Sequence, residues 1–185
     1  KHIYRISLVI VIFFLAACTT EKNTTTSRAY HNMTAHYNVY FNGKESLKSG
    51  VTKINNSVND DFSKVLPIFK SSNPSTAKAA TSEMETAIVK GSKLIQSHSI
   101  TKKPKRRKNR SKSYIEFASR EEFNNWIDEA YLLMGQAYFY QHNYTSAITN
   151  FAYIVRKFGD TPTMYDASVW LIRCYTEQER FVEAY

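Results

Sequence analysis

The sequence predicts an all-α protein in which helical hairpins stack side by side as an α-solenoid. Apolar residues recur at helical spacing through most of the chain, and no segment shows the two-residue alternation of a strand. An internal repeat near the C-terminus is the second observation, because five positions recur at a displacement of 37 residues. A fixed period of this size is typical of stacked helix pairs.

Residues 1–17 have the pattern of a lipoprotein signal peptide. Residues 1–5 are basic, and the apolar run 6–17 spans about 18 Å as a helix, which is too short for a bilayer core of roughly 30 Å. The run ends L-A-A-C at residues 15–18, which resembles a bacterial lipobox. The resemblance implies that Cys18 is lipidated through its thiol and becomes the new N-terminus. The alternative is an ordinary signal peptide followed by an incidental cysteine.

The residues that follow Cys18 favour the outer membrane. Thr19 stands where an Asp would resemble the signal for inner-membrane retention, and Glu21 is followed by Lys22 rather than by an acidic surface-export run. We therefore expect a lipid anchor in the outer membrane and a protein on its periplasmic face. Residues 18–28 are predicted to be the lipidated cysteine and a flexible, Thr-rich tether.

Residues 29–100 are predicted to form an N-terminal helical region. Within it, residues 29–59 read as a helical hairpin whose turn lies at Asn42 and Gly43, since both residue types tolerate the left-handed conformation of a helix C-terminus. Small and apolar residues at helical spacing predict a further helix over residues 77–95.

Residues 114–185 are predicted to form two helical repeats, of which the second is truncated. The matching positions are Ala130 with Ala167, Met134 with Leu171, Tyr138 with Tyr175, Tyr144 with Phe181, and Ala147 with Ala184. The unit resembles the tetratricopeptide repeat, which has about 34 residues, so a longer connection is expected at residues 159–162. The second unit stops at Tyr185, and we expect the chain to be an N-terminal fragment of a longer protein. The sequence leaves open whether residues 29–43 are an earlier, degenerate repeat.

Tetratricopeptide stacks bind a peptide or helix along the groove formed by their first helices. By position, this resemblance implies a candidate peptide groove made of Glu129, Leu132, Gln136, Phe139, Tyr140, Asp166, Val169, Arg173, Thr176 and Glu177. Leu132, Phe139 and Tyr140 are then an exposed apolar strip. Their packing beneath another helix is the alternative.

Residues 101–113 are predicted to be a disordered basic loop, because like charges repel and apolar periodicity is absent. The loop is a candidate site for an anionic partner, and its cations are Lys102, Lys103, Lys105, Arg106, Arg107, Lys108, Arg110 and Lys112. Without them and the signal peptide, the net charge of +9 falls to 15 basic residues against 16 acidic ones. The loop is either a solvated insertion or a contact with phosphate-bearing outer-membrane lipid or an acidic protein. Behind a secretory signal, nucleic acid is not an expected partner.

No catalytic or metal-binding pattern is evident, so we expect no enzyme activity, no cofactor, no metal and no small-molecule substrate. His31 and His36 are five residues apart and fall on different helix faces, while His98 and His142 are expected at surface positions. The chain has no Gly-rich phosphate loop and no nucleophile motif.

Five further residues are assigned structural roles. Trp170 is expected in the core, and Trp126 is expected to seal the end of the repeat array. Glu121 and Glu122 are expected to complement a helix dipole. Cys174 aligns with an alanine of the first unit, so a buried position is expected rather than a nucleophile.

Four stretches resemble, in order, the PorW/SprE family. They are R-A-Y-H-N-M-T-A-H-Y-N-V-Y-F-N-G at 28–43, D-D-F-S-K-V-L-P-I-F at 60–69, W-I-D-E-A-Y-L-L-M-G-Q-A-Y-F-Y at 126–140 and A-S-V-W-L-I-R-C-Y at 167–175. The resemblance implies an outer-membrane lipoprotein scaffold of the type IX secretion and gliding-motility machinery, whose partners are other secretion-machinery proteins. The alternatives are a repeat lipoprotein of another envelope process, such as outer-membrane protein assembly or glycan capture, and, more remotely, an envelope nucleic-acid binder.

Overall fold

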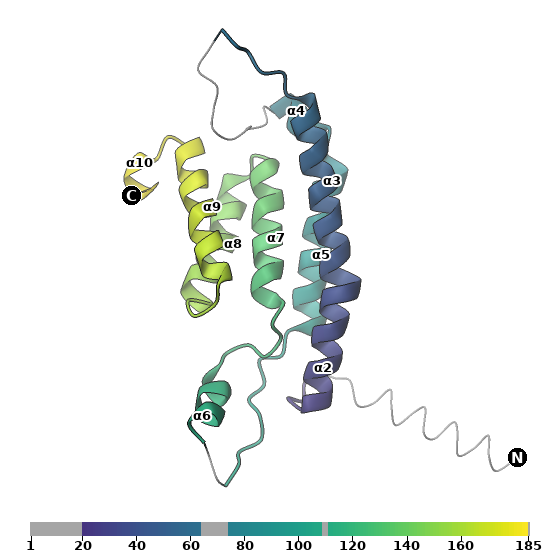
Figure 1. Cartoon of the computed structure of the whole chain (residues 1–185), viewed down its shortest axis with the longest axis vertical. Helices are drawn as coiled ribbons and strands as arrows, with labels where there is room; N and C mark the ends of the chain where they lie inside the picture. Colours follow the sequence, from purple (N-terminus) through teal and green to yellow (C-terminus); the bar gives the residue numbers. More distant parts are fainter. Residues whose placement is uncertain (1–19, 64–73, 109–110, 185) are drawn as a thin grey trace, which may run out of the picture.

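The computed structural model describes residues 20–63, 74–108 and 111–184 (Figure 1). Every regular element within these ranges is helical and no strand occurs in them, which confirms the all-α class. The predicted signal peptide, Cys18, Arg110 and part of the 60–69 stretch lie outside the described residues.

The first long element is one continuous helix made of α2 (Thr25–Thr34), the π-helical segment η1 (Ala35–Tyr40) and α3 (Phe41–Ser57). This helix begins at Thr25, within the flexible tether that was expected over residues 18–28. Thr24 caps it, because its Oγ1 accepts a hydrogen bond of 3.1 Å from the Ser27 amide, and Ser27 is fully buried. The end of the predicted tether is therefore part of the folded body.

The predicted turn at Asn42 and Gly43 is wrong, and so is the hairpin over residues 29–59. Neither residue has a positive φ, and both lie within the continuous helix, where the side-chain Nδ2 of Asn42 donates to the Asn38 carbonyl at 2.6 Å. Gly43 is buried instead, and a Cβ on it would lie 2.7 Å from Leu133 Cδ2. The glycine permits close approach of two helices. This tertiary requirement leaves the same local sequence pattern as a helix stop.

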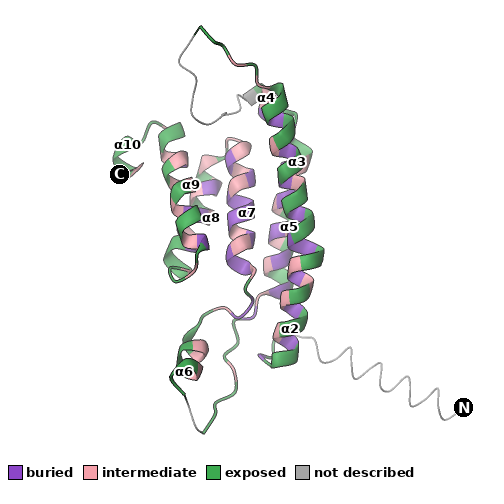
Figure 2. Cartoon of the chain, viewed as in Figure 1, coloured by how far each residue is buried: buried purple, intermediate pink, exposed green. Residues whose placement is uncertain are grey.

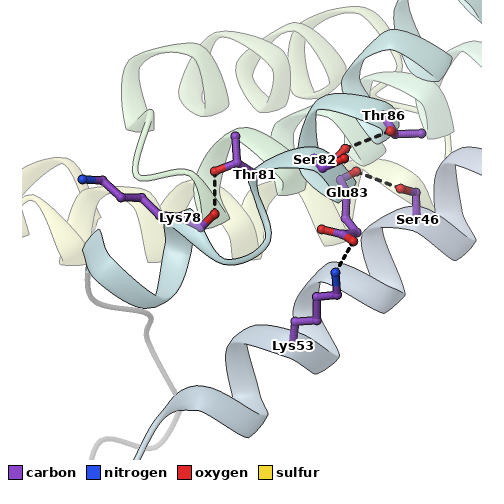
Figure 3. A network of polar contacts seen from close by, with 7 residues as sticks. All are labelled: Ser46, Lys53, Lys78, Thr81, Ser82, Glu83 and Thr86. Carbon is purple, nitrogen blue, oxygen red and sulfur yellow. Dashed lines mark hydrogen bonds and ion pairs between the residues drawn. The ribbon is translucent and has the colours of Figure 1, made fainter.

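The partner of the first helix is α5 (Thr81–His98), preceded by the short α4 (Pro74–Lys78), in agreement with the helix predicted over 77–95. Polar contacts align the two long helices (Figure 3). Ser46 Oγ donates to the Glu83 carbonyl at 2.9 Å, and the Glu83 carboxylate forms an ion pair with Lys53. The Thr81 hydroxyl donates to the Lys78 carbonyl at 3.0 Å, which holds the turn before α5.

The remaining helices continue the stack beside α5. They are α7 (Ile127–Tyr140), α8 (Tyr144–Lys157), α9 (Thr163–Glu177) and α10 (Phe181–Ala184). Helix α7 packs on α5, α8 on α7, and α9 on α8 and α7. Buried residues concentrate on α7, at the centre of the stack (Figure 2). One core cluster joins α7 to the N-terminal helices, and a second joins it to α8 and α9.

The displacement of 37 residues recurs in the backbone. After α7, the amide of Asn143 donates to the Tyr138 carbonyl at 2.9 Å, and after α9 the amide of Arg180 donates to the Tyr175 carbonyl at 2.9 Å. Each turn places one residue in the left-handed region. These residues are His142, with φ 60°, and Glu179, with φ 57°. The connection between α8 and α9 covers residues 158–162, where the longer link was expected.

Candidate functional site

The segment between α5 and α7 contains a basic strap, which we define by its described residues, 101–108 and 111–120. Contrary to the predicted disordered loop, it is held by specific contacts and contains helix α6 (Lys112–Ser119), capped by Ser111. Lys103 Nζ donates to the Ser119 carbonyl at 2.9 Å and to the Arg120 carbonyl at 2.6 Å. The Tyr114 hydroxyl donates to the Lys105 carbonyl. The strap is therefore a folded excursion from the helical stack.

The two ends of the strap are joined by Glu122. Its Oε1 accepts hydrogen bonds from the amides of Ile100 at 2.8 Å, Phe123 at 2.9 Å and Asn124 at 2.8 Å. Its Oε2 accepts one from the Ser99 hydroxyl at 2.5 Å. The expected role of this carboxylate, a complement to a helix dipole, is thus replaced by a clasp that closes the strap at its base. We call it the Glu122 clasp.

A buried histidine pair lies beside the clasp. His31 Nδ1 and His98 Nδ1 are 2.9 Å apart, and both side chains are buried, so the expected surface position of His98 is wrong. The buried side-chain Nδ2 of Asn124 donates to the His98 carbonyl at 2.9 Å, and the Oδ1 of Asn124 accepts from the backbone amide of Trp126 at 3.0 Å. These contacts fasten α2, α5 and the segment before α7 to one another.

Burial lowers the pKa of His98 below its ordinary value, and the neighbouring His31 and then Lys93 lower it further. A neutral pair can share one hydrogen bond, with one ring donating from Nδ1 and the other accepting at Nδ1. Protonation of both rings would place two donors against each other. The sequence indicates the helix face on which each histidine lies, but not that the two rings are in contact, because the residues are 67 positions apart.

The π-helical segment makes a ring contact with Trp126, the residue before α7, and a hydrogen bond with Glu129 on α7. The His36 ring stacks on the Trp126 indole, with centroids 3.8 Å apart and planes at 8°. The Tyr40 hydroxyl donates to Glu129 Oε2 at 2.9 Å. Burial first, and then the Glu129 charge, raises the pKa of Tyr40 above its ordinary value. Trp126 therefore joins the N-terminal helix to the repeats, whereas it was expected to seal an open end.

An open cleft of about 960 Å³ lies between the strap and the connection from α8 to α9. Its wall includes Glu129 from α7 together with Tyr131, Tyr153 and Lys157. Glu129 Oε1 also accepts a hydrogen bond of 3.4 Å from the Thr163 hydroxyl at the start of α9. The rings of Tyr131 and Tyr153 are 4.3 Å apart, and burial followed by the Tyr153 hydroxyl raises the pKa of Tyr131 to about 12.

The predicted peptide groove is divided by the structure into covered and exposed parts. Leu132 and Phe139 are buried in the cluster that joins α7 to α8 and α9, so the expected exposed apolar strip does not form. Tyr140 and Gln136 are half-buried. Arg173 covers this region, because its guanidinium lies 4.1 Å from the Trp170 ring centroid and 4.9 Å from that of Phe139. The physical reason is that α9 packs over the face assigned to the groove.

The second half of the predicted groove is open. Asp166, Val169, Thr176 and Glu177 are exposed on α9, with Tyr165 and Ile172 among them on the same helix. Trp170 packs in the core, as expected from its place on the helix. Cys174 is also buried there, and burial is the main cause that raises the pKa of its thiol to about 12. A thiol in this state is a poor nucleophile.

Comparisons with known proteins add no family assignment. No protein-family profile matches the chain, and no curated protein matches it. Within the described residues, no group of three His, Cys, Asp or Glu side chains is placed to hold a metal ion. In that same part of the chain, no helix has both the length and the apolar character that crossing a bilayer requires.

Proposed function

We propose that this chain is a lipid-anchored scaffold on the periplasmic face of the outer membrane, within the type IX protein secretion and gliding-motility machinery. It acts by holding other secretion-machinery proteins through helical repeats that resemble tetratricopeptide units. The anchor of the proposal is Cys18 in its lipobox-like setting, and its functional half comes from the four stretches that resemble the PorW/SprE family.

The repeated turn geometry is the observation that carries the scaffold role. The turns after α7 and α9 share their backbone hydrogen bonds and their left-handed residue at a displacement of 37 positions. Ala137 and its counterpart Cys174 are both fully buried, each at an interface with the preceding helix of the stack. Stacks built this way present extended surfaces, which suits the binding of protein partners.

Two of the four family-like stretches also meet in space. Residues 28–43 include His36 and Tyr40, and residues 126–140 include Trp126 and Glu129. The stacked rings and the Tyr40 hydrogen bond join these two stretches directly. Such contacts make the resembling residues parts of one structural unit, which supports a common fold for these stretches.

The exposed face of α9 is the surface that we assign to partner binding. Val169 is 56% exposed, whereas Leu132, its counterpart in the first unit, is 8% exposed beneath α8 and α9. The same apolar position is therefore covered in one unit and open in the next. An apolar face flanked by Asp166 and Glu177 suits a protein partner better than a small ligand.

The test is a deletion strain complemented with variants. Loss of type IX cargo secretion on deletion, and its recovery with the wild-type gene, is the expected result. Val169→Glu should reduce co-purification of secretion subunits, whereas Val89→Glu, an equally exposed change on α5, should not. Cys18→Ala should release the protein from the membrane fraction. Normal cargo secretion by the deletion strain would contradict the functional half of the proposal.

Glycan capture is the second candidate, and the cleft is the observation that favours it. Paired tyrosine rings beside polar and charged groups are suited to sugar hydroxyls and sugar faces. Isothermal titration with soluble envelope glycans separates the two functions. Saturable binding that Tyr131→Ala and Tyr153→Ala abolish would favour capture, and its absence alongside co-purified subunits would favour the scaffold.

A further inference from the structure

The basic strap is bound to the start of the folded chain. The Asn23 side-chain amide donates to the Lys102 carbonyl at 2.7 Å, and Asn23 is buried. The Arg28 guanidinium lies 4.9 Å from the Phe117 ring centroid and also hydrogen-bonds to Asn23. Figure 1 shows the strap with α6 at the same end of the molecule as the start of α2. The two segments are 79 positions apart at the Asn23 contact, yet they form one end of the body.

This end carries a dense group of exposed cations. The described ones in the strap are Lys102, Lys103, Lys105, Arg106, Arg107, Lys108, Lys112 and Arg120. Glu116 is the single acidic residue in the sequence of the strap. Within the described residues, ion pairs join Lys53 with Glu83, Lys157 with Glu121 and Arg180 with Glu183, so none of these pairs involves a strap cation. Arg107 instead lies 5.1 Å from the Tyr114 ring centroid.

The proposed lipid anchor brings these cations to a membrane. Cys18 precedes Asn23 by five residues, and five extended residues reach at most about 18 Å. A lipid on Cys18 therefore holds Asn23, and with it the Lys102 carbonyl, within that distance of the bilayer surface. Because the strap is fixed to Asn23, its charges remain near the lipid phosphates whatever the rest of the molecule does.

We propose that the basic strap binds the phosphate groups of anionic phospholipids in the membrane that holds the Cys18 lipid. The inference rests on the lipid anchor of the proposed function. Its occupant is a membrane surface and not an acidic protein, because the strap is tied to the anchored end. Ile115, which is 54% exposed, follows Lys112 by three residues on α6, and this helix has no buried residue. Apolar side chains interleaved with cations suit the interface of a bilayer.

The strap also supplies what a lipid anchor alone lacks. A polybasic segment next to an acylated residue is a second membrane attachment, and it adds orientation because its charges lie on one side of the body. With the strap on the membrane, helix α3 and the repeats rise away from the surface. The exposed face of α9 is then free to meet partners in the periplasm.

The test measures vesicle binding by the mature chain with Cys18→Ser, so that the lipid makes no contribution. Vesicles of phosphatidylcholine with phosphatidylglycerol are compared with vesicles of phosphatidylcholine alone, at low and high salt. The strap variant replaces Lys105, Arg106, Arg107 and Lys108 with Gln and leaves Lys103, which holds the strap, in place. The matched control replaces Lys48, Lys78, Lys90 and Lys93 with Gln and loses the same net charge. Far-UV circular dichroism and unfolding midpoints confirm that both variants fold.

We expect the chain to bind the anionic vesicles, and high salt to weaken this binding. The affinity for these vesicles should fall about a hundredfold or more in the strap variant and change little in the control. Equal binding by the strap variant, or equal binding to both vesicle types, would overturn the proposal. So would a strap-dependent preference for polyglutamate or an oligonucleotide over anionic vesicles in competition. Fatty-acid labelling in cells tests the anchor separately, and its failure at Cys18 would leave the vesicle result standing.

Discussion

Removing the Glu122 clasp should destabilise the whole body. In Glu122→Ala the amides of Ile100 and Asn124 lose their acceptor, and both residues are buried. The Phe123 amide keeps a second acceptor, the Ile100 carbonyl at 3.0 Å, so it adds little to the cost. Each buried donor left without a partner costs about 1–3 kcal/mol.

Two such donors predict a loss of about 2–4 kcal/mol in the free energy of unfolding, in the lower part of the summed range, because water can enter where the side chain was. For a chain of this size the unfolding midpoint then falls by roughly 4–16 °C. Glu122→Gln keeps one acceptor oxygen and should fall between the wild type and the alanine variant. Urea and thermal unfolding followed by circular dichroism measure these changes.

The matched control is Glu121→Ala at the adjacent position. The Glu121 carboxylate pairs with Lys157 on the surface, which lowers the pKa of Glu121 but holds no buried amide. Its removal should leave the unfolding midpoint unchanged. If Glu122→Ala were no less stable than Glu121→Ala, the clasp would not hold the strap to the body, and the reasoning from its hydrogen bonds would fail.

Three further predictions concern packing, protonation and thiol reactivity. In Gly135→Ala the new Cβ would lie 2.4 Å from the Phe151 ring, so an overpacking cost of about 1–3 kcal/mol should exceed the helix-propensity gain of about 1 kcal/mol. The urea midpoint of this variant should fall. Gly159→Ala, where the nearest atom is 3.6 Å away, should leave the urea midpoint unchanged. The pKa of His98 is lower in the folded chain than its unfolded value of about 6.5, so the unfolded chain binds the proton more tightly. Stability should therefore be full above about pH 6.5 and decline as the pH falls toward the folded pKa; His98→Phe should flatten this slope in unfolding measured across that range, and an unchanged slope would contradict the assignment. In a Cys18→Ser chain, Cys174 should resist a thiol reagent near pH 8 and react once urea unfolds the protein. Rapid reaction of Cys174 in the native chain would contradict its burial.

Features of the fold that depend on local pattern could be predicted from the sequence. Apolar spacing places α5, α7, α8 and α9, and the displacement of 37 residues anticipates two turns with the same hydrogen bonds. The error at Gly43 has a physical cause. A glycine after an asparagine has the same local appearance whether it ends a helix or admits a neighbouring one, and only the Leu133 side chain across the interface distinguishes the two.

The candidate site was less accessible to sequence reasoning, because its contacts join distant positions. His98 at a helix end resembles a surface residue until His31, from another helix, is placed against it. Glu122 has the local features of a dipole-complementing residue, yet its acceptor role depends on Ser99 and Ile100, which precede it by more than twenty positions. Periodicity indicates the helix face on which a residue lies, but it does not identify the residues that pack against that face.

The same limit explains how the meaning of the basic run changes. As sequence, residues 101–113 are a charge cluster that any anionic partner could meet, and self-repulsion predicts disorder. The structure adds two constraints that composition does not contain: the Glu122 clasp closes the base of the strap, and Asn23 fixes the strap beside the start of α2. A charge cluster held at both places has a defined position beside Asn23, and Asn23 follows Cys18 by five residues in the sequence, so location as well as charge selects the partner that we propose. That is why the strap is assigned to the membrane that holds the anchor, and why the exposed face of α9 is assigned to proteins.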